Sequence, residues 1–587
     1  MSRRSATSVM IAAMALAATV ACLADTDPCR ISTVRPARSF IAGEPIRFTV
    51  QSDLPLQNVT WTVTDHRGAM RASGSARFGG GGASTLRVSP AVGVGYYTLA
   101  LQFEQGGETT RPFCVLPDPE EGRGAYSGIF GIGGANTSPV VWDFAAQAGA
   151  RQMRAEFGWT SVERYEGQYE LPWVETVADL AEARGMQLTV LTGHTPAHYA
   201  ARPADLDRGI AGPSYTWQPE GTVEWYRFID AMAGRLASRQ LPAESAEPSD
   251  TLPRAGKRLV VAWEVWSEAD AAFYFGSWDR YLDMLRIAWC TVRSHGRVPV
   301  VYGSCGHMTE MNLTCDAGVG DYFDRIAYHP HGARPEYDLM HWYRNMPQAL
   351  IARGIPRDSA FTECDFHGSS AESEPGFILR LYATLRAMDE RHFVRSSCTG
   401  GVISGRDVAY GMARAVGDGL EPRPAYVGFA LTRWLLESAH YIGPLPAPEG
   451  AHVELFMRDG VPLAVAWTEA EPEQVSLQVA PSAFLLDALG GSTRIGDRPT
   501  AALDLTPEAV AVVNVSMESV PDAISGAIER ALTTELGHES PHDSGWIDTL
   551  EADAAAVVAP DFAQRLRAAV ADANQQVRRN PSQGAGA

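Results

Sequence analysis

The feature that most constrains the fold is a regular alternation of short apolar segments with amphipathic ones between residues 124 and 404. Eight apolar segments have the length and composition of buried strands. They begin near Ser127, Gln152, Gln187, Leu259, Pro299, Arg325, Ser359 and His392. Helical periodicity occupies 173–183, 223–236, 278–292, 337–352 and 376–388, whereas the helix expected in the short connection 312–323 is doubtful. Eight such alternations predict an α/β fold, a (β/α)8 TIM barrel.

A doubly wound parallel sheet that binds a dinucleotide is the alternative for the same alternation. The run Gly131-Ile132-Gly133-Gly134 follows the first predicted strand and hints at a phosphate-binding turn. It lacks the remaining glycine of that fingerprint and the acidic residue after the next strand. The sequence therefore favours the barrel.

Regions of a different pattern flank the predicted barrel. Residues 25–119 contain short alternating strands separated by turn signals, which predict an N-terminal immunoglobulin-like β-sandwich. Short strands return over 405–516 and predict a C-terminal β-sandwich. Residues 517–587 are Ala-rich, and we expect a helical tail that is partly disordered at its end.

The N-terminus has the pattern of an export signal. Arg3 and Arg4 precede an apolar run and small residues, so residues 1–24 are interpreted as a signal peptide that is cleaved after Ala24. We therefore expect a secreted or periplasmic protein without a transmembrane segment in the mature chain. The stretch 19–22 also resembles a lipoprotein box, so a lipid anchor at Cys22 is the alternative.

Export, cysteine content and charge bound the chemistry further. An oxidising compartment permits disulfides, and Cys29 with Cys114 would close the first domain; Cys305 with Cys315 is a weaker pair. The net charge of −20 excludes nucleic acid as a natural partner. A neutral or weakly charged substrate fits this charge better than a phosphate-rich one, and no cofactor is implied.

Two glutamates end two of the predicted strands. Glu268 lies at the end of strand four, where Glu264 and Trp266 point to the same side if the strand stays extended. Glu363 lies at the end of strand seven. The C-terminal ends of all strands meet at one mouth of a barrel. Paired carboxyls about 5 to 5.5 Å apart there are the chemistry of retaining glycoside hydrolysis.

Three motifs resemble those of glycoside hydrolase clan A, especially the β-xylosidase and α-iduronidase family, family thirty-nine. Residues 263–268, Trp-Glu-Val-Trp-Ser-Glu, resemble its Trp-Glu-Ile-Trp-Asn-Glu-Pro motif, and Tyr-His-Pro-His-Gly at 328–332 resembles its His-Pro-Tyr-Gly. Arg154, followed by Trp159 and by a Glu before a glycine turn, resembles its second-strand pattern. The resemblance implies a carbohydrate substrate, with Glu268 as acid/base, Glu363 as nucleophile and Arg154 orienting the nucleophile.

The chain also departs from that family's pattern at positions that touch the sugar. Ser267 replaces an Asn, Ala269 replaces a Pro, and His331 stands where a Tyr usually bonds the nucleophile. A Trp is missing from the end of strand eight. The sugar subsite is therefore remodelled, and the sugar cannot be transferred from a relative.

Several other residues are candidates for the sugar cleft, each with a plainer alternative. Trp159, Trp266 and His194 would line the cleft, or else serve packing and loops. His329 and His331 would line it too, or bind zinc with 365 and 367, but no ligand spacing links the two pairs, so no metal is expected. The rival function is a catalytically inactive carbohydrate-binding barrel, which would have no need of both glutamates and Arg154 together.

Overall fold

A computed structural model describes most of the chain between residues 29 and 536. The described residues are 29–124, 127–202, 213–241, 257–271, 273–304, 306–332, 334–337, 349–364, 370, 372–388, 394–395, 402–403, 406–407, 411–416, 419–469 and 471–536. The predicted signal peptide, Cys22, Cys305, Cys398 and the tail beyond 536 lie outside these residues. The chain divides into two compact units: residues up to 121, 126–374 and 390–430 form the first, and residues 122–125, 375–389 and 431 onward form the second.

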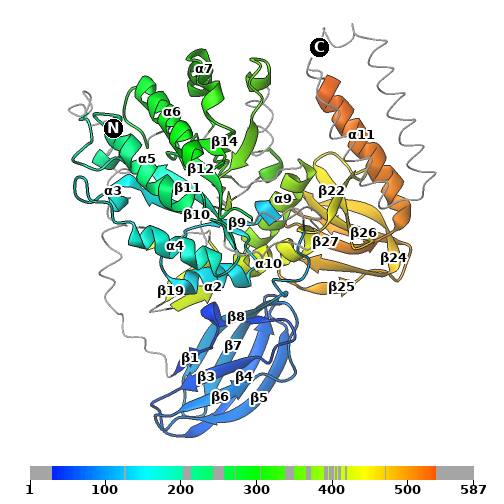
Figure 1. Ribbon diagram of the computed structural model, residues 1–587. Helices are drawn as coiled ribbons and strands as arrows, with labels where there is room; N and C mark the ends of the chain where they lie inside the picture. The colour runs from blue at the N-terminus through cyan, green and yellow to red at the C-terminus, as the bar shows by residue number, and fades with distance from the viewer. Residues whose placement is uncertain are drawn as a thin grey trace, which may run out of the picture. The chain divides into compact units, whose positions relative to one another are not determined.

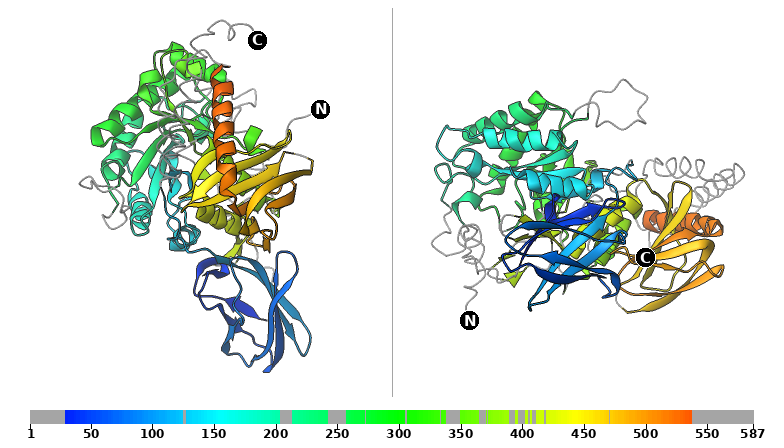
Figure 2. Two further views of the ribbon diagram at one scale, coloured as in Figure 1. Left: turned by 90° about the vertical axis from the view of Figure 1, so that its right-hand side faces the viewer. Right: turned by 90° about the horizontal axis from the view of Figure 1, so that it is seen from below.

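Two β-sheets begin the first unit (Figure 1; Figure 2 gives two further views). Their strands are β1 (Arg30–Ser32), β2 (Ser39–Ile41), β3 (Arg47–Gln51), β4 (Gln57–Asp65), β5 (Met70–Phe78), β6 (Ala83–Arg87), β7 (Gly95–Phe103) and β8 (Glu108–Leu116). The sheet orders are β1-β3-β6 and β2-β8-β7-β4-β5. Phe48 of the smaller sheet and Phe113 of the larger one share a single core, because alternate residues of each strand point inward. The immunoglobulin-like topology predicted for 25–119 remains a prediction.

A parallel sheet carries the rest of the first unit. Its strands are β9 (Gly131–Gly133), β10 (Gln152–Gly158), β11 (Gln187–Gly193), β12 (Val260–Val265), β13 (Val300–Tyr302), β14 (Arg325–Tyr328), β15 (Asp358–Phe361) and β16 (Val394–Arg395). They pair in chain order from β9 to β15, and β16 pairs with β9 on its other side. A doubly wound sheet would reverse its strand order, so that alternative is wrong. Pairing of the last strand with the first is the order of a barrel, although the described residues include no β15–β16 pair.

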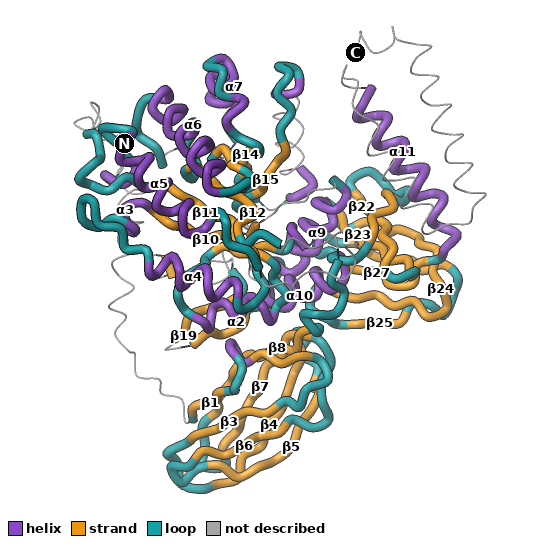
Figure 3. Tube along the Cα trace, in the orientation of Figure 1, coloured by secondary structure: helices purple, strands orange, loops and turns teal. Residues whose placement is uncertain are grey.

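Helices alternate with these strands (Figure 3). They are α2 (Pro139–Gln147), α3 (Trp159–Val162), α4 (Pro172–Glu182), α5 (Val223–Leu236), α6 (Trp278–His295), α7 (Met308–Asp316) and α9 (Glu374–Ala387). All eight predicted strands are present, seven of them beginning within two residues of the predicted start. The first begins at Gly131 rather than near Ser127, because a short 3-10 helix precedes it. The doubtful connection also holds a helix, α7, which begins before the predicted range. Most of the helix predicted over 337–352 lies outside the described residues.

Short elements follow the parallel sheet: β17 (Val402–Ile403), β18 (Arg406–Asp407), β19 (Ala413–Val416), β20 (Gly419–Pro422) and α10 (Pro424–Leu436). Within the first unit, Glu421 of β20 accepts a 2.6 Å ion pair from Arg38 of the N-terminal sheets. Tyr426 of α10 stacks on Phe144 of α2 at 3.8 Å between ring centroids and donates a hydrogen bond to its carbonyl. These contacts join Arg38, which lies between β1 and β2, to β20, and Tyr426 of α10 to α2.

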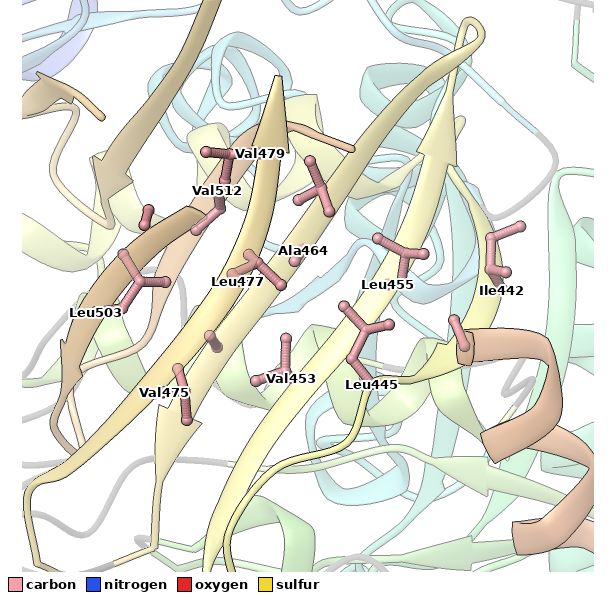
Figure 4. Close-up of a cluster of buried hydrophobic side chains, with 14 of the residues drawn as sticks. Ile442, Leu445, Val453, Leu455, Ala464, Val475, Leu477, Val479, Leu503 and Val512 are labelled. Atoms are coloured by element: carbon pink, nitrogen blue, oxygen red, sulfur yellow. The ribbon is translucent and has the colours of Figure 1, made fainter. Parts of the chain in front are cut away.

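The second unit is built on one connected antiparallel sheet. Its elements are β21 (His440–Pro444), β22 (Ala451–Arg458), β23 (Val461–Thr468), β24 (Glu473–Asp487), β25 (Ser492–Arg494), β26 (Thr500–Leu505), β27 (Val510–Val515) and helix α11 (Val520–Leu536). The register of β24 shifts between Val479 and Phe484, so β26 pairs with its first half and β27 mainly with its second. Both halves bury side chains in one core with Leu455 and Leu503 (Figure 4). The sandwich predicted for 405–516 remains a prediction.

Among the described residues, the structure contains no helix that is long and apolar enough to cross a membrane.

The predicted Cys29–Cys114 disulfide is wrong, since both thiols are free and buried. Cys29 lies close enough to Thr109 for its hydroxyl to lower the Cys29 pKa, against the larger rise from burial. Thr109 and Cys114 are five positions apart on the extended strand β8 (109 to 114). At about 3.3 Å per residue this separates them by about 16 Å, well beyond the span of a disulfide. Cys315 is free as well.

We expect Cys29 and Cys114 to be reduced in the purified protein. Burial raises the pKa of both thiols, so iodoacetamide should modify them slowly in the native state and rapidly after denaturation without reductant. Peptide mass mapping reads the result, and the exposed Cys290 provides the control that reacts in the native protein. If the denatured protein can be alkylated at Cys29 and Cys114 only after reduction, the two cysteines form a disulfide as the sequence predicts.

Candidate active site

The candidate site lies where β10, β12, β14 and β15 end. Arg154 belongs to β10 and Glu264 to β12, whereas Glu268, His329 and Glu363 follow the ends of β12, β14 and β15. Parallel strands bring their C-terminal ends to one edge of the sheet. The structure therefore brings together the predicted pair Glu268 and Glu363, with Arg154 beside them.

A buried guanidinium joins two carboxylates at the base of the site. Arg154 Nε and Nη2 donate to Glu264 at 2.7 and 3.0 Å, and Nη1 donates to Glu363 Oε1 at 2.7 Å. Burial alone would lower the pKa of Arg154, but the two carboxylates raise it overall, so the cation persists. Burial likewise raises the pKa of Glu264, yet Arg154 and His329 bring it below its usual value. These three hydrogen bonds of Arg154 fix the position of Glu363.

His329 connects the other carboxyl group to the same network. Its Nδ1 lies 2.7 Å from Glu268 Oε1, and its Nε2 lies 3.0 Å from Thr362 Oγ1. The Thr362 hydroxyl donates a hydrogen bond to Glu264 Oε1 at 3.0 Å, so its oxygen accepts the hydrogen bond from His329 Nε2. Burial opposes the charged imidazole, but Glu363, Glu264 and Glu268 raise the pKa of His329 to about 10. Near neutral pH the imidazole is therefore protonated, and its Nδ1 donates a hydrogen bond to Glu268 Oε1.

Glu363 is the ionised carboxylate of the pair. Burial raises its pKa, but His329, Arg154 and His331 together lower it to about 2. His331 Nε2 lies 3.8 Å from Glu363 Oε2, and Ser267 Oγ lies 3.4 Å from Oε1. The side chain remains 22% exposed, which leaves it accessible to a ligand. Glu268 is 17% exposed.

The two carboxyls lie close together. One ligand atom from each of Glu268, His329, His331 and Glu363 falls within 4.8 Å of the others, which bounds the distance between one oxygen of Glu268 and one of Glu363. The same four residues are the described group that could hold a metal ion. The hydrogen bond between His329 and Glu268 already joins two of them. Positions 365 and 367, considered for zinc, lie outside the described residues.

Glu268 reaches the site through a backbone turn and not through strand alternation. β12 ends at Val265, and both Trp266 (φ 67°) and Glu268 (φ 50°) have left-handed backbone, so the strand does not stay extended as far as Glu268. Hydrogen bonds from Trp266 N to Thr192 O and from Ala269 N to Gly303 O hold this turn. Left-handed backbone at two non-glycine residues costs about 1–3 kcal/mol each and persists where its surroundings enforce it.

The two tryptophans expected in the cleft are packing residues. Trp159 is fully buried, donates to Glu163 at 2.6 Å and stacks on Phe228, so it does not reach the site. Trp266 is also fully buried, and its indole donates to the carbonyl of residue 273. Trp266 instead packs against His194, at 6.0 Å between ring centroids. Their sequence signal, an aromatic beside a strand end, does not distinguish a stacking platform from a core residue.

Three residues of the site were not predicted from the sequence as functional: Glu264, Thr362 and Glu156. Glu264 is fully buried and shares Arg154 with Glu363. Its signal was present, because a charged residue inside an apolar strand requires a buried partner. Glu156, on β10, lies 3.1 Å from His194 Nδ1. Thr362 carried no signal, since a threonine directly after a strand is ordinary.

Comparison with known proteins places the fold. No protein-family model matches the sequence, and no curated protein matches it. A family 39 glycoside hydrolase from the gut symbiont Bacteroides cellulosilyticus WH2 aligns with a TM-score of 0.63 at 16% identity, over 82% of this chain and 100% of that chain. This similarity shows a shared fold and confirms, at the level of fold, the resemblance that the motifs indicate.

Two further structures align at lower scores. A GH30 endoxylanase from Clostridium papyrosolvens C71 gives a TM-score of 0.44 at 12% identity, over 68% of this chain and 99% of that chain. A glucosidase from Croceicoccus marinus gives 0.46 at 11% identity, over 68% and 98%. The fold assignment rests on the family 39 structure alone.

Gly303→Ala should disturb the turn that carries Glu268. A Cβ at this position would lie 2.0 Å from the carbonyl oxygen of Trp266 and 2.3 Å from that of Val265. Because both contacts are with backbone, we expect a loss of about 1–3 kcal/mol in unfolding free energy, measured by urea denaturation. Gly82→Ala is the control, since nothing lies within 4 Å of a Cβ there. Equal stability of the two variants would show that the turn does not need a glycine beside it.

Glu363→Gln should change how stability depends on pH. The depressed pKa of Glu363, about 2 against 4.5, gives a contribution that is present above pH 4.5 and lost as pH falls toward 2. The wild type should exceed the variant by roughly 3 kcal/mol above pH 4.5, and this difference should narrow as the pH is lowered. Urea unfolding between pH 6 and 3 measures it, with Glu104→Gln on the exposed N-terminal sheet as control. Parallel curves would contradict the ion-pair interpretation.

Proposed function

We propose that this protein is a retaining glycoside hydrolase in which Glu363 is the nucleophile and Glu268 the acid/base. One observation carries the proposal: an ionised glutamate, Glu363, and a glutamate that is hydrogen-bonded to His329, Glu268, approach within 4.8 Å. Retaining enzymes use two carboxyls about 5 to 5.5 Å apart, whereas inverting enzymes need roughly 6.5 to 9.5 Å to admit a water molecule. The fold shared with a family 39 glycoside hydrolase supports the same reaction.

In the first step, Glu363 attacks the anomeric carbon of the bound sugar. The Arg154 guanidinium and the His329 imidazole keep its carboxylate ionised. The hydrogen bonds from Arg154 to Glu264 hold the guanidinium in place and so orient Glu363. A bond forms between the Glu363 oxygen and the anomeric carbon as the bond from that carbon to the leaving oxygen breaks. The product is a glycosyl ester of Glu363 and a departing alcohol.

Glu268 supplies the proton that the leaving oxygen needs. The hydrogen bond between its Oε1 and His329 Nδ1 keeps one proton within the pair, and transfer to the leaving oxygen makes the alcohol a neutral product. In the second step, Glu268 takes a proton from a water molecule, which attacks the anomeric carbon and releases Glu363. Both protons are thereby accounted for, and configuration is retained after two inversions.

His331 and Ser267 replace side chains that the resembling family uses around the nucleophile. His331 lies 3.8 Å from Glu363 on one side, and Ser267 lies 3.4 Å from it on the other. We propose that both contact the sugar or the attacking carboxylate, with His329 as the partner of Glu268. The short hydroxyl of Ser267 leaves more room in the subsite than an Asn.

The proposal extends to the architecture around the site. The parallel strands 124–404 would close as a (β/α)8 barrel, with a β-sandwich at 25–119, a second at 405–516 and a helical tail over 517–587. The signal over residues 1–24 supports a secreted or periplasmic location, or a lipid anchor at Cys22. The substrate would be a polysaccharide or oligosaccharide. An inactive carbohydrate-binding barrel is not favoured, because binding alone would not require an ionised carboxylate beside one that is hydrogen-bonded to an imidazole.

Replacing Glu363 and replacing Glu268 should change the hydrolytic activity in different ways. Glu363→Ala removes the attacking atom, so turnover of every substrate should be lost. Glu268→Ala removes proton donation and should slow unactivated glycosides about a hundred- to ten-thousandfold, while aryl glycosides with good leaving groups should be partly spared. Azide should accelerate Glu268→Ala by replacing the activated water, and NMR should show a glycosyl azide of inverted configuration relative to the intermediate.

Glu104→Ala is the matched control, because Glu104 is an exposed glutamate of the N-terminal sheet. It should hydrolyse a panel of aryl glycosides and polysaccharides as the wild type does. Wild-type activity in either active-site variant, or no hydrolysis of any glycoside by the wild type, would overturn the proposed function.

A further inference from the structure

Glu156 is an exposed charge on a strand that is otherwise buried. In β10, from Gln152 to Gly158, it is the one exposed residue, and its side chain keeps 53% of its surface accessible. Strands of a parallel sheet are normally covered on both faces. Because side chains two apart on a strand share a face, Glu156 lies on the same side as Arg154. It therefore lines a space that opens at the candidate site.

The position of Glu156 is set by His194. The imidazole Nδ1 lies 3.1 Å from Glu156 Oε1, and His194 follows the neighbouring strand β11. Its ring meets Trp266 at 6.0 Å and Tyr215 at 5.4 Å between centroids. His194 has left-handed backbone (φ 65°), and its carbonyl accepts a hydrogen bond from Thr160 N at 2.9 Å. Packing and backbone thus fix the imidazole, and the imidazole fixes the carboxylate.

Electrostatics links Glu156 to the nucleophile. Burial raises its pKa, but the hydrogen bond from His194 and the charge of Arg154 bring it below the usual value, with Glu363 opposing. Arg154 directs its guanidinium donors at Glu264 and Glu363, so it leaves Glu156 to His194. Glu156 is thus a third carboxylate at this mouth, and hydrolysis by Glu268 and Glu363 assigns it no step.

The hydrogen-bonding chemistry of this pair selects a class of ligand. An ionised carboxylate accepts several hydrogen bonds and donates none, and His194 uses one of them. If Nδ1 carries the proton toward Glu156, Nε2 becomes an acceptor as well. Two adjacent acceptors match two hydroxyl donors of one sugar ring. A sugar carboxylate or sulfate would instead meet a like charge.

We propose that Glu156 and His194 form a hydroxyl-binding pair that recognises an uncharged sugar in the subsite served by Glu363 and disfavours acidic sugars. This inference rests on the proposed function and names its substrate class. Both residues act by orienting the sugar, so the pair is specific to binding and is separate from the bond-breaking machinery.

The test compares Glu156→Gln and Glu156→Ala with the wild type on 4-nitrophenyl glycosides of neutral sugars and on the matching uronides. Loss of a hydrogen bond to a charged group predicts a fall in kcat/KM of about 10- to 150-fold for the best neutral substrate. A substrate that lacks the contacted hydroxyl should lower kcat/KM of the wild type by the same factor, and should change kcat/KM of the two Glu156 variants little. Glu175→Gln is the control, because Glu175 is a half-exposed glutamate paired with Arg235 at 3.0 Å in the same unit.

Binding provides the second readout. Calorimetry with neutral oligosaccharides, in a Glu363→Ala background that cannot turn over, should show the same roughly 10- to 150-fold weakening when Glu156→Gln is added. A wild type that is inactive but binds neutral sugars through Glu156 would refute the hydrolase and leave the pair standing. Three outcomes would overturn the proposed hydroxyl-binding pair: unchanged kcat/KM and affinity in both Glu156 variants, a preference of the wild type for uronides, or no binding of neutral sugars. Each of these outcomes is compatible with the proposed hydrolase function.

Discussion

The buried guanidinium of Arg154 is the interaction on which the rest of the site depends. It lies between Glu264, which is fully buried, and Glu363, whose side chain is 22% exposed. Removing one partner of a buried ion pair leaves an uncompensated charge and costs about 3–5 kcal/mol. Glu264 therefore makes it tolerable to bury Arg154, and Arg154 in turn keeps Glu363 ionised and aimed. Without Glu264, the Arg154 guanidinium would be held by Glu363 alone, and the two side chains could change position together.

A second chain of hydrogen bonds extends from the same carboxylate. Glu264 accepts from Thr362, Thr362 accepts from His329, and His329 donates to Glu268. The anion that neutralises Arg154 thus also orients, through one hydroxyl, the imidazole beside the proposed acid. One buried carboxylate, Glu264, thus connects the environments of the two glutamates through hydrogen bonds, and the pKa of Glu363 is held well below its usual value by His329 and Arg154.

The residues around this network differ from the resembling motifs, whereas the residues within it match them. Ser267 and His331 depart from the resembling family's motifs and lie beside Glu363, whereas Arg154, Glu264, Glu268 and Glu363 form the connected centre. Changing a residue that contacts the sugar alters which sugar fits. Changing a residue within the ion-pair network would leave a buried charge without its partner. We therefore propose that reaction and specificity depend on different residues of one strand edge.

The sequence by itself determined the alternation of strands and helices, seven of the eight strand starts and the pairing of Glu268 with Glu363, because hydrophobic periodicity and strand ends are local properties of the chain. It could not determine that Trp159 and Trp266 are buried, since an aromatic residue beside a strand end looks the same in a cleft and in a core. It also could not show that Thr362, Glu264 and Glu156 join the site, or that Cys29 and Cys114 lie apart. Those outcomes depend on left-handed backbone after β12 and on residues of different strands meeting, and only the tertiary structure decides which groups share a buried space.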